Sequence, residues 1–348
     1  MNTLWKYAIK GARSVTQRSP ILSADQVIAT FNHGQGSNFQ GSIVSLCPDT
    51  GSENWRFDRP HFFTQPVFAD DGAILTTGFD GVAHRIGPDG RSIWASPVTE
   101  RNLWAGALHS ERFVFSEIGG LSEFTWAVDA RTGEVVWRYR DGGHSYGVVF
   151  DRAGSVFITS AAHNFDASSY SLHGVDVETG QANWQTAHSE ILFRPVVLDD
   201  LIVVGSRGAI AAFDCADGSL VSRLKIGSGS DFNQNLIRQG DTVFTASNQG
   251  HVVALSLQAT RGIFGRAKRA LKPAWEAHLG SPVQFFAFAR GSLACLTQSG
   301  DLCIVDPDDG SLLARTKLAR FEEGMGLAAI GDHGFIAAVD RHCARIEP

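Results

Sequence analysis

The sequence predicts an all-β protein, an eight-bladed β-propeller whose blades each have four antiparallel strands. Two observations lead to this prediction. A short phrase (Asp, two residues, Thr-Gly or Asp-Gly, three residues, Trp) recurs about every 38 to 53 residues, the repeat length of propeller blades. Between the copies, alternating apolar residues are interrupted by turns rich in glycine, as expected of meandering strands.

The phrase is explained as the turn between the two outer strands of a blade. Its clearest copy is AVDARTGEVVW, from Ala127 to Trp137. Gly accepts the positive φ that such a turn needs, and an Asp side chain can accept hydrogen bonds from nearby backbone N–H groups. The Trp then lies on the outer strand and can pack flat against the next blade. Six tryptophans are predicted to dock blades in this way: Trp5, Trp55, Trp94, Trp137, Trp184 and Trp275.

Counting the outer strands gives the number of blades. Seven are predicted, near Trp55, Trp94, Trp137, Trp184, Ser222, Trp275 and Ala314. An eighth meander, residues 324–346, has no outer strand after it. Because TLWKYAI near the N-terminus resembles VVWRYR at Val135–Arg140, residues 3–9 are expected to complete that blade. Residues 1–348 would then form one propeller domain, and its closure would remove free sheet edges.

Composition and cysteine usage limit the choice of partner and compartment. The formal net charge is −6, which disfavours binding to phosphate backbones. No apolar run is long enough to span a membrane, and the N-terminal residues show no signal peptide. Five scattered cysteines are typical of free thiols, so a cytoplasmic location is expected. Counting back from a turn at Gln298–Asp301 pairs Cys303 with Leu296 and not with Cys295.

Blade six departs from the repeat, because an insertion at residues 258–274 replaces its turn. Apolar residues from Ile263 to Leu271 fall at helical spacing, which predicts a short basic amphipathic helix ended by Pro273. A protein partner is the favoured ligand, ahead of a membrane surface or nucleic acid bound through 262–272. The alternative is a surface insertion packed on its own blade. The candidate partner-binding residues are Arg261, Phe264, Arg266, Lys268, Arg269 and Lys272.

A second candidate site is one mouth of the central channel, where the inner strands begin. Aromatic and Arg side chains give much contact energy in a small area, although the same residues could simply pack between blades. The longer loops His33–Gln40, 117–123 and 162–170 are expected to open on the same face. The candidate ligand-binding residues are Arg18, Gln65, Trp104, Tyr146, Arg194, Gln234 and Phe285.

The repeat Asp-x-x-Thr-Gly-x-x-x-Trp resembles that of the quinoprotein alcohol dehydrogenase superfamily, the PQQ-like propellers, over essentially the whole chain. Length and blade number are similar to the propeller lipoprotein of the bacterial β-barrel assembly machinery, but the lipoprotein signal and lipidated Cys are not seen. Many quinoprotein dehydrogenases carry an adjacent Cys-Cys pair over the cofactor, and this sequence has none. The resemblance therefore implies the fold more than quinone-dependent catalysis.

No histidine pair has metal-binding spacing, and no nucleotide-binding or nucleophile-elbow motif is present. No catalytic residue, metal ligand or cofactor is predicted. The leading hypothesis is a non-catalytic scaffold or adaptor subunit of a multi-protein bacterial assembly. The alternative is a small-molecule or glycan binder, or a lyase or hydrolase, that uses the channel mouth.

Overall fold

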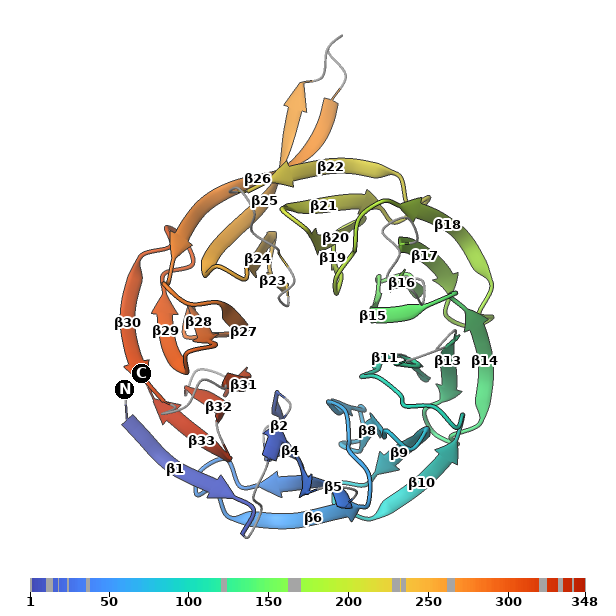
Figure 1. The fold of residues 1–348 in the computed structure, drawn as a ribbon, viewed down its shortest axis with the longest axis vertical. Coiled ribbons are helices and arrows are strands. Elements are labelled where there is room, and N and C mark those ends of the chain that lie inside the picture. Colours follow the sequence, from blue (N-terminus) through green and yellow to red (C-terminus); the bar gives the residue numbers. More distant parts are fainter. Residues whose placement is uncertain are drawn as a thin grey trace.

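The computed structural model shows eight sheets arranged around one axis (Figure 1), which confirms the predicted eight-bladed propeller. The structure describes residues 2–10, 15–17, 19–23, 25–35, 38–119, 124–161, 170–226, 232, 236–261, 267–318, 324–330, 334–339 and 341–347. In these ranges there is no helix long and apolar enough to cross a membrane.

Each blade is a meander that runs from an inner strand near the axis to an outer strand at the rim. Blade one contains β2 (Val15–Gln17), β3 (Ile21–Leu22), β4 (Val27–Gln35), β5 (Asn38–Leu46) and β6 (Glu53–Arg59). Blade two contains β7 (Val67–Phe68), β8 (Ile74–Thr77), β9 (Val82–Ile86) and β10 (Ser92–Pro97). Blade three contains β11 (Ala107–His109), β12 (Arg112–Ser116), β13 (Phe124–Asp129) and β14 (Val135–Arg140). Blade four contains β15 (His144–Phe150), β16 (Ser155–Ala161), β17 (Tyr170–Asp176) and β18 (Ala182–His188).

The remaining blades follow the same order. Blade five contains β19 (Val196–Leu198), β20 (Leu201–Ser206), β21 (Ala209–Asp214) and β22 (Leu220–Lys225). Blade six contains β23 (Ile237–Gln239), β24 (Thr242–Ala246), β25 (His251–Arg261) and β26 (Ala267–His278). Blade seven contains β27 (Val283–Ala289), β28 (Ser292–Thr297), β29 (Asp301–Val305) and β30 (Leu312–Lys317). Blade eight contains β31 (Gly324–Ala329), β32 (Phe335–Val339), β33 (His342–Glu347) and β1 (Asn2–Ala8).

The N-terminal strand closes the ring. β1 pairs antiparallel with β33 as the outer strand of blade eight. Trp5 is buried, and its indole N–H donates to the backbone carbonyl of Pro48 in blade one at 2.8 Å. Arg345 donates to the same carbonyl at 2.9 Å and pairs with Asp49 at 2.9 Å. The two ends of the chain therefore lock blade eight onto blade one.

The same contact joins other neighbouring blades. The indole N–H of Trp137 in blade three donates to the carbonyl of Val177, in the outer turn of blade four, at 2.7 Å. The ring lies on Gly180 of that turn, where an added Cβ would come within 2.6 Å of the indole. The equivalent bonds, between 2.7 and 3.2 Å, join Trp55 to Pro88, Trp94 to Ala130, Trp184 to Cys215 and Trp275 to Pro307.

This geometry explains why two copies of the repeat lack Trp. Ser222 and Ala314 stand at the Trp position of blades five and seven. The next blade in each case lacks an ordinary outer turn, because blade six carries the insertion and blade eight is built from the two ends of the chain. An indole at either position would have no turn to cover.

Every outer strand also shifts register by one residue just before the Trp position. In blade three, for example, Val135 pairs with Val128 and Trp137 with Ala127, so Val136 is left out of the ladder. A bulge bends and twists its strand. We attribute the rotation of each indole toward the next blade to this bulge.

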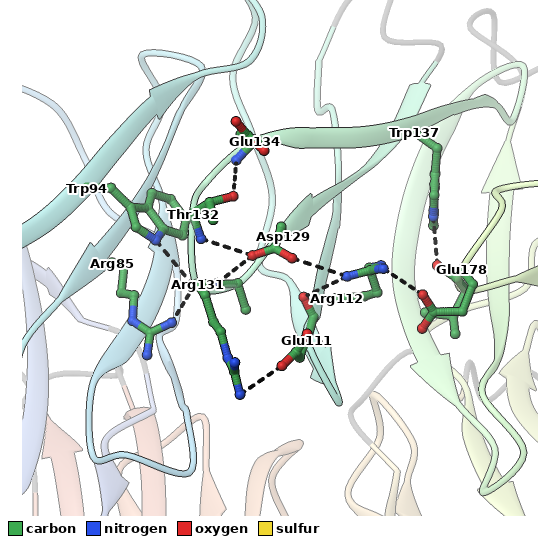
Figure 2. Close-up of polar contacts among 12 residues, drawn as sticks. Arg85, Trp94, Glu111, Arg112, Asp129, Arg131, Thr132, Glu134, Trp137 and Glu178 are labelled. Atoms are coloured by element: carbon green, nitrogen blue, oxygen red, sulfur yellow. Dashed lines mark hydrogen bonds and ion pairs between the residues drawn. The ribbon is translucent and has the colours of Figure 1, made fainter.

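Ion pairs add to the docking of blades two to four (Figure 2). Arg112 in blade three lies between Asp129 of its own blade, at 3.4 Å, and Glu178 of blade four, at 2.7 Å. Arg85 donates to the Ala130 carbonyl that Trp94 also uses. The turns are fixed internally as well. In blade four, for example, hydrogen bonds from the side chain and backbone of Thr179 lower the pKa of Asp176.

A buried polar cluster lies between blades three and four. Asp141 is only 4% exposed and accepts hydrogen bonds from the Thr125 hydroxyl at 2.6 Å and the Gly143 N–H at 3.2 Å. Ser116 contacts Thr125 at 2.7 Å. Burial raises the pKa of Asp141 to about 6, because the ionised carboxylate is poorly solvated there.

His173 continues this cluster. Its Nδ1 lies 2.9 Å from the Tyr139 hydroxyl, and its Nε2 lies 2.7 Å from the Ser171 hydroxyl. Ser160 contacts Nε2 at 3.3 Å and donates to the backbone carbonyl of Asp141 at 3.0 Å. His173 is 1% exposed, and its burial lowers its pKa to about 4. The cluster therefore links two blades through a neutral imidazole.

Two predictions about local pairing are wrong. The expected loop His33–Gln40 is largely strand, because β4 and β5 pair as far as Gln35 and Asn38. Cys303 pairs with Cys295, and Leu296 pairs with Leu302. The reason for the second error is that the loop between the strands has three residues, 298–300, instead of the two of the expected turn, with the Gly300 N–H donating to the Thr297 carbonyl. All five cysteines are free.

The Trp contact can be separated from backbone strain by two matched substitutions. Gly180 and Gly208 have nearly the same positive φ, 68° and 66°, but only Gly180 lies against an indole. Gly180→Ala is expected to lower the free energy of unfolding by about 1–3 kcal/mol more than Gly208→Ala, because the methyl group overpacks the Trp137 contact. Urea unfolding would measure the difference, and equal losses would rule out the indole contact as the cause.

The pH dependence of stability tests the buried cluster. The pKa of Asp141 is raised on folding, so its contribution to stability is present below about pH 4 and is lost as pH rises through about 6. His173 acts in the opposite sense, because its pKa falls to about 4 on folding. Asp141→Asn removes only the first effect. Between pH 4 and 6 the stability of this variant should therefore rise more steeply than that of the parent, by up to about 3 kcal/mol. Parallel curves from urea titrations would contradict the assignment.

Candidate protein-interaction site

The insertion of blade six is a β-hairpin, not the predicted helix. β25 and β26 extend beyond the other strands of their sheet, and Figure 1 shows their ends projecting outward from the ring. We call residues 257–261 and 267–271 the blade-six arm, whose rungs run from Leu257 opposite Leu271 to Arg261 opposite Ala267. A short helix without packing is marginal in water, whereas two strands that continue an existing ladder need no new nucleus.

The base of the arm packs on blade five. Leu271 is 2% exposed and lies in the apolar cluster between blades five and six, with Leu257 packed against it. The Leu271 N–H donates to the Ser222 hydroxyl at 3.1 Å. In six other blades an indole N–H on the outer strand donates to a carbonyl of the next blade. Here the outer strand of blade five accepts from a backbone N–H of the next blade.

An ion pair fixes the arm further out. The Arg269 guanidinium makes two hydrogen bonds to the Asp200 carboxylate, one of them 2.8 Å between Nη2 and Oδ2. Hydrogen bonding from the Arg269 side chain is the main cause of the lowered pKa of Asp200. Asp200 belongs to the turn after β19, and its neighbour Asp199 pairs with Arg238 of blade six at 3.0 Å. Asp199 and Asp200 of blade five therefore both hold blade six.

The other candidate residues of the insertion lie at different places along the arm, and two of them are not described. Lys272 is exposed at the base of the arm. Arg261 and Lys268 stand on the two strands near its end. Phe264 and Arg266 lie outside the described residues. From Leu257 to Lys272 the sequence contains five basic residues and no acid, so the arm is strongly cationic although the chain as a whole is acidic.

The predicted channel-mouth residues do not form one described cluster. Arg18 and Gln234 lie outside the described residues. Gln65 and Trp104 precede the inner strands of blades two and three and are partly buried. The backbone of Trp104 makes hydrogen bonds to blades two and three. Its N–H donates to the backbone carbonyl of Ser116 in blade three, and its carbonyl accepts from the Thr77 hydroxyl in blade two.

Two of the other three predicted residues are associated with packing between blades. Phe285 packs against the apolar cluster between blades seven and eight. Arg194 of blade five lies against Gly147 of blade four, where an added Cβ would come within 2.9 Å of the Arg194 Cγ. Burial lowers the pKa of Arg194. Tyr146 stands at a register shift in β15.

Within the described part of the chain, no group of three His, Cys, Asp or Glu residues could hold a metal ion. His173 is buried and contacts Ser171 of its own strand, and the hydroxyl of Tyr139 from blade three, rather than a carboxylate, lies at the other ring nitrogen. The anchors of the arm, Ser222 and Asp200, were missed from sequence. The available signal was a missing Trp in blade five followed by a missing turn in blade six.

The comparisons with solved structures agree with the fold. BamB from Moraxella catarrhalis is 16% identical and has a TM-score of 0.66, with 99% of this chain and 96% of that one covered. Sqt1 from Chaetomium thermophilum, in a structure where it is bound to the N-terminus of ribosomal protein L10, is 16% identical with a TM-score of 0.76 and 98% coverage of both chains. A europium-containing methanol dehydrogenase is 12% identical with a TM-score of 0.69, covering 97% of this chain and 84% of that one.

A search of curated protein sequences gives no match. A family model does match, over residues 39–263, which is more than half of the chain. Its description is outer membrane protein assembly factor BamB. The match includes the repeat copies at Trp55, Trp94, Trp137 and Trp184 and the first strand of the blade-six arm. The chain therefore belongs to the family of the outer membrane protein assembly factor BamB, among the PQQ-like propellers.

Proposed function

We propose that the protein is a non-catalytic scaffold or adaptor that binds other protein subunits, and that the blade-six arm holds one of them. The arm is the observation that carries this proposal. It replaces an ordinary turn, is anchored by Ser222 and Asp200, and then projects beyond the ring. Anchoring at the base with projection of the end suits a rigid binding element on a rigid scaffold.

Similar propellers favour a protein as the ligand. The matching family is described as an assembly factor, and Sqt1 was solved with a segment of another protein bound. Fold likeness at this level of identity does not transfer a partner. The free cysteines fit a reducing compartment, and we propose that the assembly is cytoplasmic.

An affinity pull-down from the native host tests the proposal. The baits are the full chain and a variant in which an Asp-Gly turn replaces residues 258–270, which keeps Leu257, Leu271 and Ser222 in place. Because the arm projects from the ring, the variant should fold with a similar melting temperature but lose a stoichiometric partner seen with the full chain. Arg91→Glu, on an exposed turn of blade two, serves as the control bait. Identical partners for all three baits would exclude the arm.

A further inference from the structure

The arm has two strand edges with different surroundings. β24 pairs with β25 only as far as Ser256, opposite Thr242. Beyond that rung, the described residues Leu257–Arg261 pair with β26 alone. The edge of β26 faces blade five, where Leu271 and Arg269 are engaged. The edge of β25 is therefore the one along which another strand can lie.

An arm of this kind gains from a third strand. A two-stranded ribbon is only marginally stable in water unless it packs on something, and open edges are templates for pairing. Outside its base, the described rungs carry small or polar residues, among them Ala259 and Ala270. Gln258 and Ala259 are exposed. Backbone hydrogen bonds along β25 are thus the main binding energy that this part of the arm can offer.

The charge of the arm selects the chemistry of the incoming strand. Arg269 is neutralised by Asp200, but the sequence places Arg261, Lys268 and Lys272 on the arm or at its base with no acid among them. Positions 268 and 272 fall on one face of β26 by the two-residue period of a strand. A strand added to β25 lies about 10 Å from β26, which long Lys and Glu side chains can span together. Two copies of the arm would repel each other.

We propose that an extended acidic segment of a partner protein adds as a strand to the β25 edge of the arm, over Leu257–Arg261. Main-chain hydrogen bonds hold the segment, as in other strand-addition complexes. Acidic side chains of the segment form ion pairs with the Lys and Arg residues of the arm. This inference rests on the proposed scaffold function and assigns the class of its partner and the mode of binding.

Backbone methylation of a probe peptide tests strand addition directly. The probe is a labelled 12-residue peptide of alternating Glu and Thr, titrated with the full protein and followed by fluorescence anisotropy. In a strand, all Glu N–H groups point to one edge and all Thr N–H groups to the other. N-methylation of one set should weaken binding about tenfold or more, and methylation of the other set should leave it nearly unchanged. Equal binding of the two methylated peptides would overturn strand addition.

Charge variants and other anions test the partner class. Lys268→Glu with Lys272→Glu should weaken binding of the unmethylated peptide about tenfold, whereas Arg91→Glu should not. A thymidine 12-mer or phosphatidylserine vesicles that bind more tightly than the peptide, and are lost with the same double variant, would overturn an acidic protein as the partner. Failure of the peptide in every form, beside a partner captured through the arm, would reject this inference and leave the scaffold proposal intact.

Discussion

The contact between the indole of one blade and the outer turn of the next governs this structure. The turn needs a glycine so that the ring can lie on it, as Trp137 lies on Gly180, and an acid that fixes the turn from within, as Asp176 does. The bulge before each Trp position turns the ring toward its neighbour. Closure by the N-terminal strand uses the same contact, with Trp5 against the turn of blade one. A single interaction therefore accounts for the repeat, the glycines and the closure.

The blade-six arm exists where that contact has been exchanged for another. Ser222 accepts a hydrogen bond from Leu271, and Arg269 replaces the missing contact with an ion pair to Asp200. Because these groups hold the base, the strands beyond it need not pack on the ring. The candidate interaction site and the exception to the docking rule are thus the same feature. This coincidence is the physical reason why we propose a function for the arm rather than for the axial face.

Most of the fold could be predicted from the sequence, because the Trp-containing repeat reports both blade number and closure. The arm could not. Ile263, Phe264, Ala267, Ala270 and Leu271 satisfy a helical period. The structure instead pairs Ala267–Leu271 with Leu257–Arg261, as a continuation of the ladder of blade six. The predicted register of Cys295 and Cys303 was wrong because one additional residue in the loop changes which residues pair. The axial site stays a prediction, because an inner-strand side chain can face the axis or a neighbouring blade, and a repeat does not say which.

One double-mutant cycle tests the central claim that an indole and the following turn form a unit. The first change is Ser222→Trp, and the second replaces residues 256–272 with the six-residue turn Asp129–Glu134. Free energies of unfolding in urea give the coupling between them. Ser222→Trp alone should destabilise the protein, and the two changes together should show a favourable coupling of about 1 kcal/mol or more. Additive effects, within about 0.3 kcal/mol, would contradict the account.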